Sequence, residues 1–219
     1  MEFELKQGLF SPDGRLIQVE NAQHSTRQGC TMVFHADGDR VIVVHENRQT
    51  NPLLLPMPRF FEVDYERRIY IAYSGLRPDA TRVTNEAIAL CRNYRYSVGE
   101  DIRLETLARK IGEYKQQYTV DRSYRPLGLR TVLFGIQDGE AHVYIVETDG
   151  NFARYTRCAV GYKSEIAMEY LEKNGGSDCA FKAIMEVVQK DFKKIKGFVL
   201  SNGGLEAVPE EKIQEIMSH

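Results

Sequence analysis

LFSPDGRLIQVENAQHSTRQ, residues 9–28, opens with the turn tetrad Ser11-Pro12-Asp13-Gly14. Proline presets φ at the second position of such a turn, aspartate can bond to the local backbone, and glycine tolerates the exit geometry. After the turn, Leu16, Val19 and Ala22 follow at helical spacing on one narrow apolar face. We therefore expect a turn and a short polar helix, whose narrow apolar face is typical of a contact element between subunits.

The composition is that of a soluble globular protein with a large core. The chain has 219 residues, of which 42% are hydrophobic and 27% charged, and its formal net charge is −2. A charge this close to zero argues against nucleic acid or anionic membrane as a partner. The longest apolar runs have the length of strands, not of membrane spans, and the N-terminus lacks the basic and apolar regions of a secretory signal.

The cysteines and histidines show no pattern that would hold a metal. The four cysteines are scattered without a Cys-x-x-Cys pair, and the histidines have no metal-ligand spacing. We expect no metal, no cofactor and reduced thiols in an intracellular compartment. Four basic residues on one helical segment are interleaved with Glu105 and Glu113, which is typical of a solvated helix face. They are Arg103, Arg109, Lys110 and Lys115.

Strands and helices are predicted in blocks. Short apolar runs bounded by turn residues predict strands over residues 30–35, 40–45, 60–64, 69–74, 130–137, 141–148, 151–160 and 198–200. Apolar residues at steps of three and four predict helices over residues 76–96, 102–119, 163–173, 177–192 and 209–217.

This order argues for antiparallel sheets covered by helix pairs, and against a doubly wound parallel sheet. We predict an α+β fold, a four-layer α-β-β-α sandwich of two antiparallel sheets. It forms a single domain over residues 1–219, with neither a linker nor a repeat.

Several motifs, in the right order, resemble those of 20S proteasome alpha subunits. The match covers nearly the whole chain. Within the family, the chain most resembles the subunit at the first position of the eukaryotic alpha ring, on the basis of Arg-Pro-Leu-Gly at residues 125–128 and of the C-terminal residues 210–216. The matching segments are residues 9–19 (the alpha-type signature), 73–80 (similar to SGL-x-x-DAR), 117–119 and 125–128 (similar to YTQ…RPxG), 149–150 and 159–161.

The resemblance implies the fold of N-terminal nucleophile hydrolases and a subunit without chemistry of its own. In this family seven alpha subunits form the outer ring of a barrel, cap the proteolytic beta rings, gate substrate entry and dock regulatory particles. The implied partners are other alpha subunits, beta subunits and activators with C-terminal tails, in ubiquitin-dependent degradation in cytoplasm and nucleus. A homo-oligomeric ring in a simpler particle stays open, because one sequence does not distinguish copies from paralogues.

The position of the family's nucleophile is blocked in this chain. Beta-type relatives cut peptides with an N-terminal threonine whose own amine is the base. Here the equivalent Thr31 is internal, and the supporting acid and lysine are replaced by Glu46 and Arg59. We therefore predict that the chain is not an enzyme. The alternative is an autoprocessed hydrolase, in which cleavage after Gly29 would expose Cys30 as the nucleophile.

Arg59 also falls where alpha subunits usually carry the lysine of an inter-subunit pocket. That pocket accepts the C-terminal carboxylate of activator tails, which arginine can bind in a bidentate way. We predict an activator-docking pocket of Arg59, Gly75 and Leu76. The alternative for Arg59 is a surface arginine paired with a neighbouring acid.

The gate segment, residues 1–28, departs from the family pattern. Phe3, Glu4 and Leu5 stand where Tyr-Asp-Arg is usual, and Asn21 stands where a tyrosine is usual, whereas Pro12 is kept. The missing arginine and tyrosine remove contacts that organise an open gate. We expect a divergent gate that contributes little to closing the pore.

Overall fold

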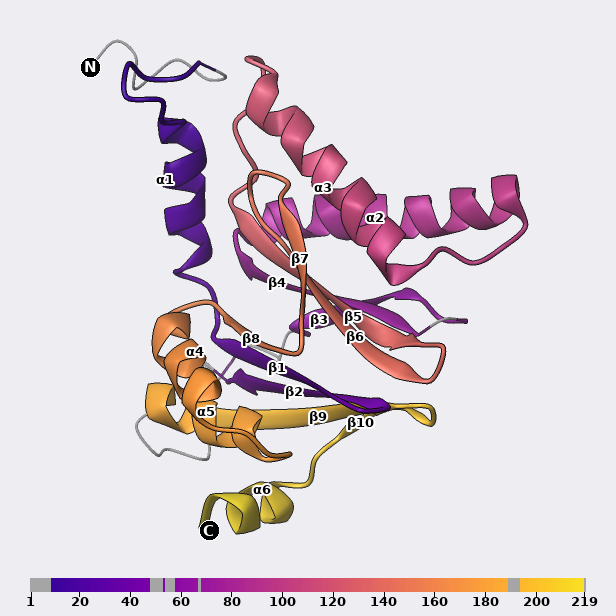
Figure 1. The fold of residues 1–219 in the computed structure, drawn as a ribbon, viewed down its shortest axis with the longest axis vertical. Helices are drawn as coiled ribbons and strands as arrows, with labels where there is room; N and C mark the ends of the chain where they lie inside the picture. Colours follow the sequence, from indigo (N-terminus) through magenta and orange to yellow (C-terminus); the bar gives the residue numbers. More distant parts are fainter. Residues whose placement is uncertain (1–8, 48–52, 54–57, 67, 189–193, 219) are drawn as a thin grey trace.

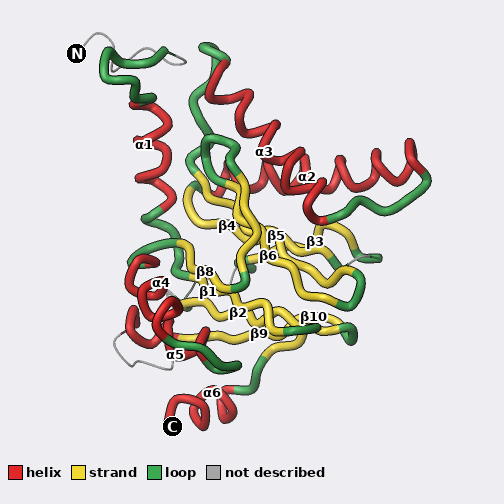
Figure 2. Tube along the Cα trace, in the orientation of Figure 1, coloured by secondary structure: helices red, strands yellow, loops and turns green. Residues whose placement is uncertain are grey.

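The computed structural model describes residues 9–47, 53, 58–66, 68–188 and 194–218, which form two stacked sheets between layers of helices. Each sheet has five strands, in the orders β10-β9-β2-β1-β8 and β3-β4-β5-β6-β7. Every recorded strand pair is antiparallel. The predicted α-β-β-α sandwich of two antiparallel sheets is confirmed (Figures 1 and 2).

The first sheet contains β1, the strand that begins directly after Thr31. Its strands are β1 (Met32–Asp37), β2 (Arg40–Glu46), β8 (Arg157–Val160), β9 (Ile195–Ser201) and β10 (Gly204–Ala207). Alternate residues of β1 face opposite layers, because side chains along a strand alternate in direction. Phe34 packs between the sheets, whereas Val33 packs against the helices.

The second sheet follows the predicted hairpins except at one strand. Its strands are β3 (Phe60–Asp64), β4 (Ile69–Gly75), β5 (Leu129–Gln137), β6 (Glu140–Val146) and β7 (Phe152–Tyr155). The turn between β5 and β6 has positive φ at both Asp138 and Gly139, as a two-residue hairpin turn requires. The prediction of one strand over residues 151–160 is wrong, because the chain leaves the second sheet after Tyr155 and enters the first at Arg157.

Two helix pairs cover the outer faces of the sheets (Figure 1). The helices are α1 (Ile17–Thr26), α2 (Arg77–Val98), α3 (Leu104–Val120), α4 (Ser164–Lys173), α5 (Cys179–Val188) and α6 (Glu210–Ser218). Helices α2 and α3 pack on the second sheet, and α4 and α5 pack on the first. Helix α2 ends where Gly99 adopts a left-handed conformation, with φ of 81°.

The prediction that Lys115 lies on a solvated helix face is wrong. Lys115 is fully buried on the apolar side of α3, one turn beyond the equally buried Ile111. Its place follows from the helical period of 3.6 residues, which puts the two side chains on one face. The charge of the side chain hid this position, since lysine is almost never fully buried.

Helix α1 lies at one end of the sandwich (Figure 1), and few of its residues are buried. Only Val19, Ala22 and Thr26 of this helix are buried. Val19 and Ala22 are two of the three residues of the predicted apolar face. The third, Leu16, is half-buried at the N-cap.

Candidate functional site

The chain passes through the nucleophile position as it enters β1. Thr31 is completely buried, and its hydroxyl donates a hydrogen bond of 2.6 Å to the carbonyl oxygen of Tyr162. The amide of Tyr162 in turn donates to the carbonyl oxygen of Gly29 at 3.0 Å. The nitrogen of Thr31 belongs to a peptide bond, so it has no lone pair available to act as a base.

The structure brings Glu46 and Cys30 to the same place. The hydroxyl of Thr31 lies 3.4 Å from a carboxylate oxygen of Glu46, and the thiol of Cys30 lies 2.8 Å from the carbonyl oxygen of Glu46. Thr31, Glu46 and the alternative nucleophile Cys30 are therefore neighbours. Their polar atoms bond to the chain itself, at the junction of β1, β2 and the segment before α4.

Arg59 lies at the same end of the sandwich, directly before β3. Burial is the main reason that the pKa of His45 in β2 is lowered to about 4, and the nearby cations of Arg59 and Lys196 contribute to this shift. The ring of His45 stacks on Phe198, with 5.7 Å between the centroids. His45 is therefore a neutral, packed ring that adds no second positive charge near the half-buried Arg59.

Gly75 and Leu76, the other predicted docking residues, connect β4 to α2. Gly75 has φ of 127°, and a Cβ atom there would lie 2.2 Å from the carbonyl oxygen of Gly128. The same oxygen accepts a hydrogen bond of 2.9 Å from the amide of Leu76. Phe60 of β3 pairs with Ala72 of β4, and Gly75 of β4 pairs with Leu129 of β5. Arg59 therefore directly precedes the strand that lies beside β4, and β4 leads to Leu76.

An ion pair at this junction was missed by the sequence analysis. The guanidinium of Arg125 donates two hydrogen bonds of 2.7 Å to Asp79, and the amide of Gly128 donates a third of 2.9 Å. Burial raises the pKa of Asp79, but these bonds outweigh burial and hold the pKa below its ordinary value. Both residues belong to the motifs quoted above, yet no sequence signal pairs positions so far apart.

The predicted gate residues fall into two groups. Phe3, Glu4 and Leu5 lie outside the described residues. Pro12 is exposed in its turn, which the amide of Gly14 closes by donating to the carbonyl oxygen of Ser11 at 2.9 Å. Asn21 is exposed on α1. Both described gate residues are therefore open to contact with another molecule.

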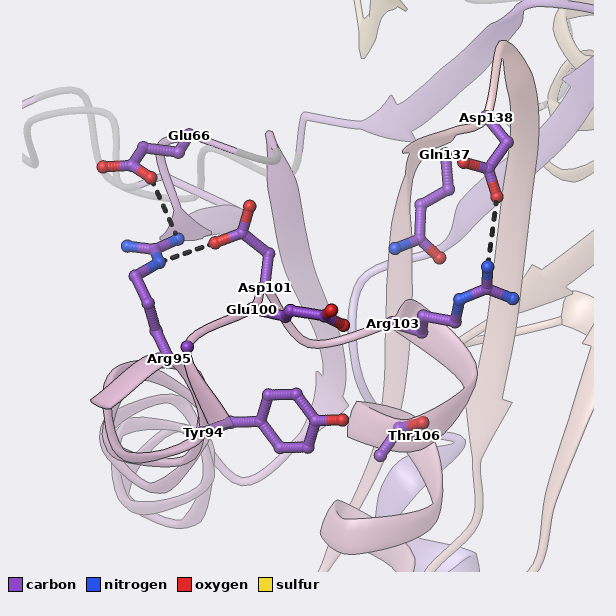
Figure 3. A pocket seen from close by; sticks show the side chains of 10 residues that line it. Glu66, Tyr94, Arg95, Glu100, Asp101, Arg103, Thr106, Gln137 and Asp138 are labelled. Atoms are coloured by element: carbon purple, nitrogen blue, oxygen red, sulfur yellow. Dashed lines mark hydrogen bonds and ion pairs between the residues drawn. The ribbon is translucent and has the colours of Figure 1, made fainter. Parts of the chain in front are cut away.

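A polar hollow of about 650 Å³ lies between the α2–α3 loop and the β5–β6 turn (Figure 3). The guanidinium of Arg95 contacts Asp101 at 2.6 Å and Glu66 at 3.4 Å, and also binds Asp64 from β3 at 2.9 Å. These ion pairs tie the α2–α3 loop to the second sheet. The described residues that line the hollow include no serine, cysteine or histidine.

In the described part of the chain, no group of three or more His, Cys, Asp or Glu side chains is placed to hold a metal ion. Within the same residues, no helix combines the length and the apolar character needed to cross a membrane.

The family model for the proteasome subunit matches residues 26–208. The chain is 30% identical to proteasome subunit alpha type-7-1 of Drosophila melanogaster, over 89% of this chain and 83% of the relative. It is 33% identical to proteasome subunit alpha of Methanocaldococcus jannaschii, over 82% and 69%, and 31% identical to proteasome subunit alpha type-7 of Solanum lycopersicum, over 96% and 85%. These names state no ring position, so the resemblance to the first-position subunit stays a prediction.

Proposed function

This chain belongs to the proteasome subunit family as an alpha-type member, and from that premise we propose that it is a non-catalytic subunit of the outer alpha ring of a 20S proteasome. The observation that carries the proposal is the state of Thr31. Its nitrogen is tied up in a peptide bond and its hydroxyl donates to the carbonyl oxygen of Tyr162. An N-terminal threonine hydrolase needs both groups free, the amine as base and the hydroxyl as nucleophile.

The proposed work of the subunit is therefore assembly, substrate gating and activator docking. Helix α1 supports this role, because its exposed polar faces and its few buried residues suit an element that is covered by neighbouring subunits. The proposed partners are other alpha subunits in a seven-membered ring, beta subunits, and regulatory particles with C-terminal tails. The proposed setting is ubiquitin-dependent degradation in the cytoplasm and nucleus, within a hetero-oligomer.

The docking pocket is proposed at Arg59, Gly75 and Leu76. Arginine presents two parallel N–H groups to a carboxylate, and it stays charged at any physiological pH. Leu76 follows β4, the strand that pairs with β3, and 43% of its surface is exposed, which offers an apolar contact for the tail. The carboxylate at the end of an activator tail is the ligand that this combination would bind.

Two mass measurements on one preparation test the proposal. The chain is tagged at its C-terminus, purified with its bound partners, and measured by native and by denaturing mass spectrometry. We expect a particle with beta-type and other alpha-type subunits, in which this chain keeps its N-terminal segment. A particle with this chain as its sole alpha component would favour the homo-oligomeric ring. A mature chain beginning at Cys30 would overturn the non-catalytic role in favour of the autoprocessed hydrolase.

A further inference from the structure

The backbone of Gly128, which directly precedes β5, joins three separate parts of the fold. Its amide donates to the carboxylate of Asp79 in α2 at 2.9 Å. Its carbonyl oxygen accepts from the amide of Leu76 at 2.9 Å. It also lies 3.1 Å from the hydroxyl of Ser25 in α1, whose proton it shares with the carbonyl oxygen of Ala22 at 2.7 Å. The backbone of one residue therefore connects α1, the proposed docking loop and the start of α2.

The packing around Gly128 leaves its backbone little room to move. A Cβ atom at Gly128 would lie 2.5 Å from the hydroxyl of Ser25 and 3.0 Å from a methyl carbon of Leu76. A second bond attaches α1 to β4, because the hydroxyl of Ser74 donates to the carbonyl oxygen of Thr26 at 2.7 Å. A shift of Gly128 would therefore displace both α1 and Leu76.

The position of Gly128 is itself set by Arg125 and Asp79. The two bonds of 2.7 Å between these residues are bidentate, and the carboxylate of Asp79 is nearly inaccessible to solvent. Such charge-assisted bonds are short and directional, so they fix orientation as well as distance. Arg125 belongs to the loop after α3, and Asp79 lies in the first turn of α2.

Helix α1 depends on these polar bonds because its apolar contact is small. Three of its residues are buried, and two of them are the small residues Ala22 and Thr26. Burial of apolar surface contributes in proportion to the area removed from water, so this helix gains little from it. The bonds of Ser25 and Ser74 therefore carry a large share of its attachment.

We propose that Arg125 and Asp79 are positioning residues for α1 and Leu76, acting through the backbone of Gly128. The pair thereby sets α1 and the docking pocket relative to the α2–α3 helix pair. The consequence for gating rests on the proposed function, whereas the mechanical link rests on the geometry alone. The ion pair would couple the helix layer on the second sheet to the end of the sandwich where α1 lies.

Hydrogen exchange of the full-length chain tests the link directly. Arg125→Lys keeps the positive charge but loses the bidentate geometry, and is compared with the unchanged protein. We expect amides of residues 17–26 to exchange at least about tenfold faster, because the local opening of α1 becomes easier. Amides of α5, which packs on the other sheet, serve as the internal reference for global unfolding.

The molecule offers a matched control at the other end of α2. Arg95 binds the buried carboxylate of Asp64 with two bonds of 2.9 and 3.0 Å, and its ion-pair partners among the described residues, Asp64, Glu66 and Asp101, all lie outside α1. Arg95→Lys should leave exchange in α1 unchanged. Unchanged exchange in α1 of Arg125→Lys would overturn the proposal, and so would equal acceleration of α1 by Arg95→Lys.

A double-mutant cycle separates positioning from a general loss of stability. Ser25→Ala removes the hydroxyl that bonds both to Gly128 and to Ala22 within the helix, and should by itself loosen α1. If Arg125 acts through Gly128, adding Arg125→Lys to Ser25→Ala should accelerate α1 exchange by less than the product of the single effects. A simple product would contradict the proposal. None of these measurements needs an activator. The positioning role of Arg125 and Asp79 can therefore fail or hold independently of whether the proposed docking function is correct.

Discussion

The ammonium group of Lys115 donates a hydrogen bond of 2.8 Å to the carbonyl oxygen of Val146 in β6. A second bond, of 3.2 Å, goes to the carbonyl oxygen of Leu129 in β5. The side chain has no exposed surface, and burial lowers the pKa of Lys115 to about 7. A lysine of α3 thus links the ends of two adjacent strands, and both of its acceptors are neutral carbonyl oxygens.

This burial predicts a pH dependence of stability. The pKa of Lys115 falls from its ordinary 10.5 in the unfolded chain to about 7 in the fold. Between these values the unfolded chain binds more protons, so the free energy of unfolding contributed by Lys115 rises with pH. Its slope is at most about 1.4 kcal/mol per pH unit. Below pH 7 both states are protonated, and the cost of burying the charge is constant.

Urea unfolding of the chain from pH 7 to pH 9 measures this slope. Lys115→Met has no titrating group and should lose the contribution. Lys212→Met removes an exposed lysine of α6 and should keep it. Equal slopes for the unchanged chain and Lys115→Met would contradict the assigned pKa shift.

Gly75→Ala should destabilise the chain by about 3 kcal/mol or more, since it combines backbone strain with a steric collision. The added Cβ would lie 2.2 Å from the carbonyl oxygen of Gly128. Gly204→Ala is the matched control, because Gly204 has a similar φ of 123° but no atom within 4 Å of such a Cβ. Urea titration of both variants isolates the collision. Equal losses would show that Gly75 is needed for its φ alone.

Arg59→Glu should weaken the binding of a peptide that copies an activator tail. Removing the cation and adding a negative charge should cost at least about tenfold in affinity, because a charge-assisted hydrogen bond contributes about 1.5–3 kcal/mol. Fluorescence anisotropy with the purified particle measures the change. The same peptide with an amidated C-terminus is the control, since it lacks the carboxylate. An Arg59→Glu particle that binds the tail normally would refute the pocket.

Thr31→Val should cost about 1 kcal/mol of stability and leave the peptidase activity of the particle unchanged. The substitution keeps the shape of the side chain but removes the donor to Tyr162. Thermal unfolding measures the first effect, and cleavage of a fluorogenic peptide measures the second. Loss of peptide cleavage without loss of assembly would show that Thr31 takes part in catalysis.

The strand blocks and the long helices were predictable because local chemistry decides them. Asp138-Gly139 requires a tight hairpin, and the steps of three and four in α2 and α3 require one apolar face each. The division between β7 and β8 was not predictable from these signals. The run of residues 151–160 has the composition of one strand. In the fold its first part, β7, pairs with β6 of the second sheet, and its last part, β8, pairs with β1 of the first sheet.

By itself, the sequence determined that Thr31 is internal and that Gly75 precedes a helix, since covalent order and local chemistry fix both. Tertiary structure alone decided that Arg125 meets Asp79 and that Lys115 is buried. The physical reason is that charged side chains go inside only where a specific partner offsets their loss of water. Such partners come from distant segments, here the loop after α3 for Asp79 and the strand ends of β5 and β6 for Lys115.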